Sequence, residues 1–181
     1  MNKKRLQLKH SYRLLNHGPT VLISTIYKGK PNIMPIAWQT PIDFEPPRFA
    51  LVIGDHSHTF RTIKKTKALV INIPSAGLID KVYGCGKCSG RDANKFERFK
   101  FTPLPAKTVN APLIKECIGH IECKVTDMRL ADKYNIFIVE GTYAWVEKGY
   151  FKDIWLTKKA KTLHHLSGRH FSVTEKTVSA R

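Results

Sequence analysis

The chain has 181 residues, of which 42% are hydrophobic and 10% aromatic; this suits a single folded domain over residues 1–181 and excludes a mainly disordered protein. Its formal net charge is +17, but seven basic residues precede the first acidic residue, Asp43, and six more lie from Lys158 onward. We therefore expect basic tails at residues 1–16 and 174–181 with a mixed surface between them. This distribution argues against a dedicated nucleic-acid groove, although the same field would attract an anionic small molecule.

Targeting and membrane segments are not evident. No apolar run approaches the roughly 20 residues of a membrane-spanning helix, and the basic start is not followed by the apolar stretch of a secretory signal. The four cysteines are then expected to be reduced thiols. These features favour a cytoplasmic protein with no membrane partner.

The first half of the chain contains four strand candidates. Residues 20–27 are apolar and β-branched, and the turn residues 28–31 lead into a return strand at 32–38. Pro35 cannot donate to a ladder, so it predicts an edge, a bulge or an interruption in that strand. Further strands are predicted at residues 48–54 and 68–74.

Three helices are predicted between and after these strands. Ser57 is placed to cap a helix that runs through Lys67, and Ser75 to cap a second helix that includes Leu78 to Tyr83. A Gly- and Cys-rich loop at residues 84–90 precedes a third short helix at 92–99.

The second half is dominated by two long strand candidates. Prolines make residues 102–113 a loop, and strands at 117–128 and 134–146 are joined by a connection short enough for an antiparallel hairpin. Residues 163–171 are expected to form a compact loop that ends in a short strand. Because strands outnumber helices, the sequence predicts a mainly β fold, an antiparallel barrel with peripheral helices.

Motifs for common enzyme classes are missing. The chain has no dinucleotide-binding Gly-x-Gly-x-x-Gly, no P-loop and no Gly-x-Ser-x-Gly. Cys85-Gly86-Lys87-Cys88 has the spacing of a metal knuckle or a redox pair, but no second pair follows it. We therefore favour structural or incidental cysteines over zinc ligands, and expect no metal centre.

Two predicted helix starts suit an anion. Ser89-Gly90-Arg91-Asp92 with Lys95 combines a flexible loop, a hydroxyl and two cations, and His58-Thr59 with Arg61 forms a similar start. The alternative for each is a capped surface helix whose charges are solvated.

Several short segments match one known family in order. The most specific pair is the Pro-Asn to Ala-Trp segment at residues 31–38 and the Ser-Gly-Arg-Asp-x-x-Lys-Phe segment at residues 89–96. The other matching segments are 18–25, Pro46-Pro47, His58-Thr59, 70–74, Cys85-Gly86, 111–113, Glu116-Cys117, Glu122-Cys123 and 163–166. In these segments the chain resembles the flavin-reductase-like proteins that include flavoredoxin.

The resemblance implies an FMN-binding split barrel, a small Greek-key antiparallel barrel that forms a homodimer and holds FMN near the subunit interface. The segment from Met34 to Thr40 would run alongside the flavin ring, and the turn at residues 57–59 with Ser89 and Gly90 would lie near its polar and phosphate parts. The implied cofactor-binding residues are Asn32, Met34, Pro35, Ile36, Ala37, Trp38, Gln39, Thr40, Ser57, His58, Thr59, Ser89, Gly90, Lys95 and Phe171. From the residues alone, Trp38 and Phe171 could equally be core residues.

The implied function is an FMN-dependent oxidoreductase of the flavin reductase type, supplied with electrons by NADH, NADPH or a redox protein. No side chain is expected to act as a catalytic nucleophile, while a cation such as Lys95 would favour the anionic reduced flavin. A non-catalytic FMN carrier or sensor and a basic nucleic-acid-binding barrel remain as alternatives. Tyr134 is a departure, because many family members have a histidine at this position.

Overall fold

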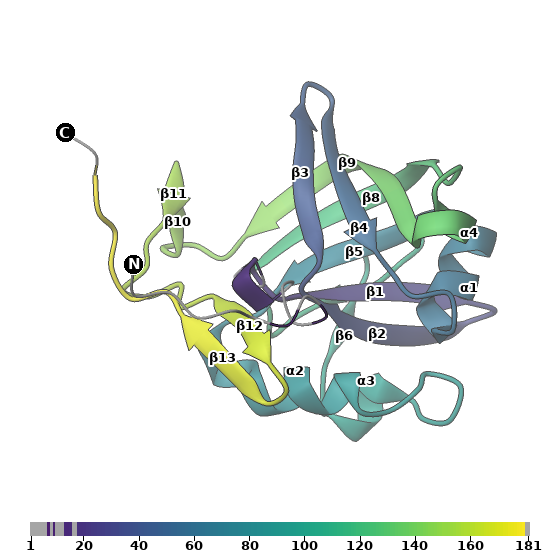
Figure 1. The fold of residues 1–181 in the computed structure, drawn as a ribbon, viewed down its shortest axis with the longest axis horizontal. Coiled ribbons are helices and arrows are strands. Elements are labelled where there is room, and N and C mark those ends of the chain that lie inside the picture. Colours follow the sequence, from purple (N-terminus) through teal and green to yellow (C-terminus); the bar gives the residue numbers. More distant parts are fainter. Residues whose placement is uncertain (1–6, 8, 10–12, 16–17, 180–181) are drawn as a thin grey trace.

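The computed structural model in Figure 1 describes residues 7, 9, 13–15 and 18–179. The predicted tail at residues 1–16 therefore lies largely outside the described residues, and residues 174–179 have no regular secondary structure. None of the helices in the described part has the length and apolar character to cross a membrane.

Seven strands form one antiparallel sheet in the order β2-β1-β5-β8-β9-β4-β3. Their bounds are β1 (Val21–Tyr27), β2 (Lys30–Ile36), β3 (Gln39–Phe44), β4 (Pro47–Val52), β5 (Ala68–Ile73), β8 (Gly119–Asp127) and β9 (Ile136–Val146). Short two-stranded pairs are β6 (Pro103–Leu104) with β7 (Leu113–Ile114), β10 (Phe151–Lys152) with β11 (Ile154–Trp155), and β12 (Leu163–Ser167) with β13 (His170–Val173).

The sheet is rolled into a split barrel. Strands β2 and β3 are its two edges, yet only Ala37 and Trp38 separate them in the chain, so the two edges must meet at this point. Beyond it they diverge, and Figure 1 shows β3 rising away from β2. The predicted mainly β split-barrel fold is confirmed, and Pro35 lies on an edge strand as its missing N–H predicts.

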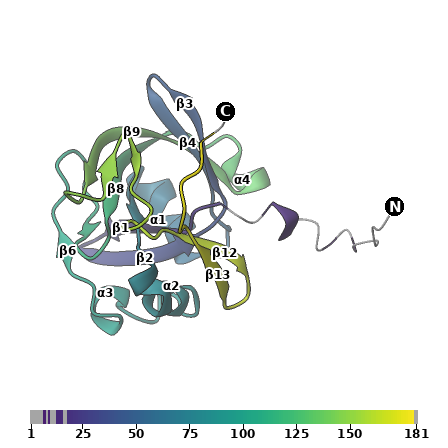
Figure 2. The same cartoon turned by 90° about the vertical axis from the view of Figure 1, so that its left-hand side faces the viewer.

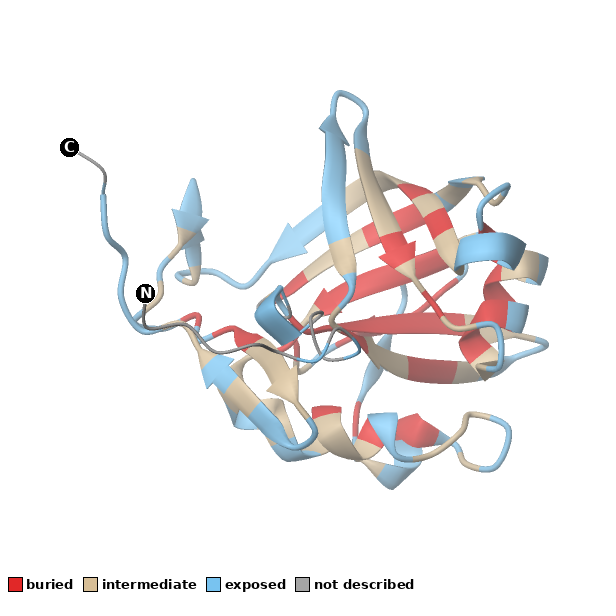
Figure 3. Ribbon diagram, viewed as in Figure 1, coloured by how far each residue is buried: buried red, intermediate tan, exposed pale blue. Residues whose placement is uncertain are grey.

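Apolar side chains pack on both faces of this sheet, and Figure 3 shows the buried residues concentrated in its central strands. Inside the barrel, Ile23, Leu51 and Phe137 pack with Phe60 from helix α1 (His58–Thr66), whose ring meets that of Phe137 edge-on at 5.1 Å. Outside β1 and β2, a second cluster includes Leu22, Ile33 and residues of α2 (Ile79–Gly86) and α3 (Lys95–Arg98). Figure 2 shows α2 and α3 beside β2, outside the barrel.

Helix ends follow local capping chemistry, with two corrections to the sequence prediction. The Ser57 hydroxyl accepts from the Phe60 N–H at 3.0 Å, which confirms the start of α1. Ser75 instead precedes a 3₁₀ turn, η2 (Ala76–Leu78), without a side-chain cap bond, and α2 extends to Gly86. Helix α3 begins at Lys95 rather than at residue 92, because the Asn94 side chain accepts from the Phe96 N–H at 3.2 Å.

The remaining differences from the predicted elements lie in short or irregular segments. Strands β8 and β9 pair antiparallel as predicted, with a short helix, α4 (Ala131–Tyr134), in their connection. Strands β3, β10 and β11 were not predicted, nor was the short pair β6–β7 at the two ends of the predicted loop at residues 102–113. Residues 163–173 form a hairpin rather than a loop before one strand.

A buried carboxylate ties the proline-rich loop at residues 102–113 to the barrel. Glu122 on β8 is 0% exposed and accepts from the backbone N–H groups of Lys107 and Thr108, the Thr108 hydroxyl and Trp145 Nε1. Burial alone would raise the pKa of the Glu122 carboxyl, but these donors outweigh it and lower the pKa.

Candidate functional site

Three pockets meet around Pro35 on the edge strand β2. The polar pocket, about 290 Å³, is lined by Asn32, Met34, Pro35, residues 56–59, residues 85–91 and Lys95. The aromatic pocket, about 200 Å³, is lined by Thr20, Pro35, Ala37, Val82, Tyr83, Gly86, Lys87, His165, Gly168 and Phe171. The Trp38 pocket, about 380 Å³, is lined by residues 34–38, Val52, Gly54, Asn135 and His165.

A buried amide forms part of the wall of the polar pocket. Asn32 on β2 is 3% exposed, and its Nδ2 donates to the hydroxyl of Thr59 in the first turn of α1 at 2.9 Å. Its Oδ1 has no hydrogen-bond partner in the described part of the chain. A buried acceptor without a partner costs free energy, so it suits a ligand that brings a donor.

Gly90 lies directly against this amide. A Cβ atom at position 90 would overlap Asn32 Oδ1 and approach Cδ2 of His58 to 3.1 Å. The Ser89-Gly90 loop can therefore pack on β2 and α1 only because position 90 lacks a side chain.

Cations without acidic partners surround the same pocket. Lys95 is 4% exposed, and its ammonium donates to the Cys85 carbonyl at 2.7 Å. Burial lowers the pKa of Lys95. The pKa of His58 is also lowered, first by burial and then by the positive charges of Arg91, Lys95 and Arg61. Among the residues that the structure describes, neither Lys95 nor Arg91 forms an ion pair with a carboxylate.

The N-terminus of α1 adds to this positive potential. Its first turn contains no acidic residue, and Ser57 satisfies only the Phe60 N–H. Backbone donors, hydroxyls and cations therefore converge on one cavity, which is the chemistry of an anion site.

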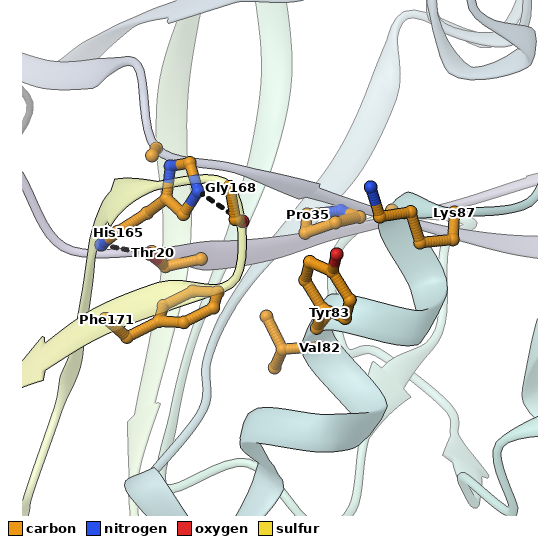
Figure 4. A pocket seen from close by; sticks show the side chains of 10 residues that line it. Thr20, Pro35, Val82, Tyr83, Lys87, His165, Gly168 and Phe171 are labelled. Atoms are coloured by element: carbon orange, nitrogen blue, oxygen red, sulfur yellow. Dashed lines mark hydrogen bonds between the residues drawn. The ribbon is translucent and has the colours of Figure 1, made fainter. Parts of the chain in front are cut away.

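The flat side chains of Tyr83, His165 and Phe171 form part of the lining of the aromatic pocket (Figure 4). The ring centres of His165 and Phe171 are 5.1 Å apart. The backbone N–H of His165 donates to the Thr20 hydroxyl at 3.0 Å, and the ring atom Nε2 of His165 lies 3.1 Å from the Gly168 carbonyl oxygen. Tyr83 lies on the α2 side, with the Lys87 ammonium 4.9 Å from its ring centre. These surfaces could take a planar ring.

Most residues that the sequence predicts as cofactor-binding line these pockets. The exceptions are Gln39, whose Nε2 donates to the Pro19 carbonyl at 2.9 Å, and Thr40, whose hydroxyl donates to the Pro41 carbonyl. Trp38 is 51% exposed, so it is not the core residue that its type alone allows. Phe171 packs partly buried against the cluster outside β1 and β2 and also faces the aromatic pocket.

Other lining residues were missed as site residues. Lys87, Tyr83 and His165 occupy walls that only the three-dimensional structure brings together, although His165 lies in a segment that matches the family. Tyr134 is 53% exposed, and its neighbour Asn135 lines the Trp38 pocket. No group of three or more His, Cys, Asp or Glu side chains placed to hold a metal occurs within the described ranges.

Comparisons with known proteins agree with this geometry. Residues 13–165 match the model of the flavin reductase like domain. The uncharacterized protein YddH of Escherichia coli K12 is 33% identical over 182 residues, covering 97% of this chain and 96% of that protein.

Solved structures with the same fold were also found. An FMN-binding domain of a flavin reductases-like enzyme from Shewanella baltica OS155 is 28% identical with a TM-score of 0.86, covering 97% of this chain and 96% of that chain. Flavoredoxin of Desulfovibrio vulgaris (Miyazaki F) is 23% identical with a TM-score of 0.84, covering 99% of this chain and 94% of that chain, a likeness of fold.

Proposed function

Because the chain belongs to the flavin reductase like domain family, we propose that it is an FMN-dependent oxidoreductase that passes electrons from NADH, NADPH or a redox protein through bound FMN. We also propose that it acts as a homodimer in the cytoplasm, where its four free cysteines fit a reducing compartment.

The observation that carries the proposal is the joining of a cationic pocket to two flat-walled pockets at Pro35. FMN has the same division into an anionic phosphate, a hydroxylated chain and a planar ring. The phosphate would be held by Ser57, Thr59, Ser89 and the cations Arg91 and Lys95, and a hydroxyl of the chain would supply the donor that Asn32 Oδ1 lacks.

The ring would lie along residues 34–38, with Trp38 and Phe171 as neighbouring apolar surfaces. Since β2 is an edge strand, part of its backbone polar groups point away from β1 and are left for the polar edge of a ligand. Bound FMN supplies the reversible uptake of one or two electrons.

The side chains of this site act by position and charge. Lys95 is held by the Cys85 carbonyl and is kept from water, so its charge is little screened and favours an anionic ligand in the cavity. His58 is neutral at pH 7, because its lowered pKa lies below its ordinary value near 6.5. It can therefore accept or donate one hydrogen bond at this wall without adding charge.

The test is anaerobic mixing of the FMN-loaded protein with NADH or NADPH, with free FMN as the control. We expect reduction of the bound flavin by at least one of the two nicotinamides, and steady-state turnover when an electron acceptor is added. Tight FMN binding without reduction by either nicotinamide, or by a reduced redox protein, would instead support the carrier or sensor function.

A further inference from the structure

Two cysteines lie in the wall of the polar pocket. Cys85 is in the last turn of α2, and Cys88 lies two residues after the end of that helix. Lys87, the C-cap residue between them, still has a helical backbone conformation. Residues three apart in helical geometry have Cα atoms about 5 Å apart, within the range that a disulfide spans. The backbone spacing of the two residues therefore allows an intramolecular disulfide after rotation of the side chains.

Cys88 is more exposed than the other three cysteines, which are buried. Cys88 is half-buried, and its thiol points back to the last turn of α2, where Sγ lies 3.8 Å from the Gly84 carbonyl. Cys85 and Cys117 are both buried in the cluster outside β1 and β2, and Cys123 is buried inside the barrel. Of the four cysteines, Cys85 and Cys88 line the polar pocket, and Cys117 and Cys123 do not.

Lys95 connects the pair to the charge of the site. Its ammonium bonds the Cys85 carbonyl at 2.7 Å, and its charge acts on the Cys85 thiol against the effect of burial. Burial still raises the pKa of Cys85 to about 12, so Cys85 is protonated in the reduced form at neutral pH. Cys88 is the member of the pair that solvent can reach.

We propose that Cys85 and Cys88 form a redox-active pair that exchanges two electrons with the flavin held in the same cavity. The inference rests on the proposed function, since the flavin is the redox partner. In the balanced step, the Cys85–Cys88 sulfur–sulfur bond breaks as the disulfide takes two electrons and one proton from the anionic, fully reduced flavin and a second proton from water. The products are two thiols and oxidised flavin, and the reverse step closes the disulfide.

The pair itself is tested first without flavin. The apoprotein is equilibrated in mixtures of oxidised and reduced glutathione and quenched with acid, its free thiols are alkylated in denaturant, and it is digested with trypsin. Cleavage after Lys81, Lys87 and Arg91 separates residues 82–87 from 88–91, so these two peptides stay joined only if Cys85 and Cys88 are bonded. We expect the joined peptides in oxidising mixtures, with Cys123 alkylated throughout; separate peptides in every mixture would overturn the proposal.

Exchange with flavin is tested by counting electrons. The oxidised, FMN-loaded protein is titrated with dithionite under anaerobic conditions, and we expect four electrons per flavin for wild type and for the control Cys123→Ala, but two for Cys88→Ser. Two electrons for wild type would overturn the exchange while leaving the proposed function intact. Failure to load FMN would count against the proposed function instead, and the peptide result still decides whether the pair forms.

Discussion

At the scale of single residues, the burial of Lys95 is the clearest difference between a ligand-binding position and a solvated surface charge. The sequence allowed a solvated helix charge at this position, but the side chain is 4% exposed and donates to a backbone carbonyl. A buried cation without a carboxylate partner is costly, so it is retained where an anion compensates it.

We therefore predict that Lys95→Met weakens FMN binding. A charge-assisted hydrogen bond is worth about 1.5–3 kcal/mol, which corresponds to a roughly ten- to hundredfold loss of affinity. The anionic reduced flavin loses more than the oxidised form, so the midpoint potential falls. FMN fluorescence titration and a potential measurement check this, with the exposed Arg98→Ala on the same helix as control; equal affinity and potential in wild type and Lys95→Met would remove Lys95 from the site.

Gly90 gives a second prediction at this scale. In Gly90→Ala the new methyl group would overlap Asn32 Oδ1, and the buried Asn32 side chain is held in place by the hydrogen bond that its Nδ2 donates to Thr59. Such overpacking costs about 1–3 kcal/mol, and a displaced Asn32 also lowers FMN affinity. Gly77→Ala is the matched control, because its nearest neighbour would be the Ser75 hydroxyl at 4.0 Å. Urea unfolding that is unchanged in Gly90→Ala would show that the loop does not pack on Asn32 as described.

At the scale of elements, the sequence predicted the long strands that contain buried residues, and it missed the exposed strands β3, β10 and β11 and the two-residue strands β6 and β7. Strand β1 has buried residues from Val21 to Thr25, whereas β3 is exposed along most of its length and so has no alternation to detect. The predicted start of α3 was three residues too early, because Asp92 and Asn94 are both good capping residues. Only the structure shows that the Asn94 side chain accepts the capping hydrogen bond from the Phe96 N–H.

The site was predicted unevenly for a similar reason. Most of the lining residues lie in the segments that match the family. The wall formed by Tyr83, Lys87 and His165, however, brings together α2 and the β12–β13 hairpin, which are far apart in the sequence. Helical periodicity assigns Tyr83 to an amphipathic helix and does not say which partner that helix meets.

Strands β1, β5 and β8 share a polar network that gives a pH prediction. Asn72 Oδ1 accepts from the Ile114 N–H at 2.9 Å and lies 2.9 Å from Nδ1 of His120, which therefore donates. Burial lowers the pKa of His120 to about 4 from its ordinary value of 6.5. The unfolded chain thus takes up a proton below pH 6.5 that the folded chain does not.

The contribution of His120 to stability is therefore full above about pH 6.5 and is lost as the pH falls towards about 4. We predict that His120→Gln makes the free energy of unfolding less dependent on pH in this window, measured by urea unfolding at several pH values. The exposed His170→Gln serves as control. An unchanged slope for His120→Gln would mean that the imidazole is not buried in its neutral form.

At the scale of the whole molecule, large apolar side chains remain uncovered on one subunit. Trp38, Phe44, Trp145 and Ile154 are 51%, 90%, 42% and 57% exposed, and surfaces of this kind mark association. We predict that the FMN-loaded protein sediments as a dimer at micromolar concentration. Sedimentation as a monomer under these conditions would contradict the proposed homodimer without affecting the fold.

The central claim is that the pockets around Pro35 hold FMN, and titration of FMN into the apoprotein tests it most directly. The account predicts saturation at one FMN per subunit, a visible flavin spectrum after gel filtration, and release of intact FMN on denaturation. A protein that stays colourless after reconstitution, and that binds single-stranded oligonucleotides in a strongly salt-dependent manner, would contradict the account and favour the basic nucleic-acid-binding barrel.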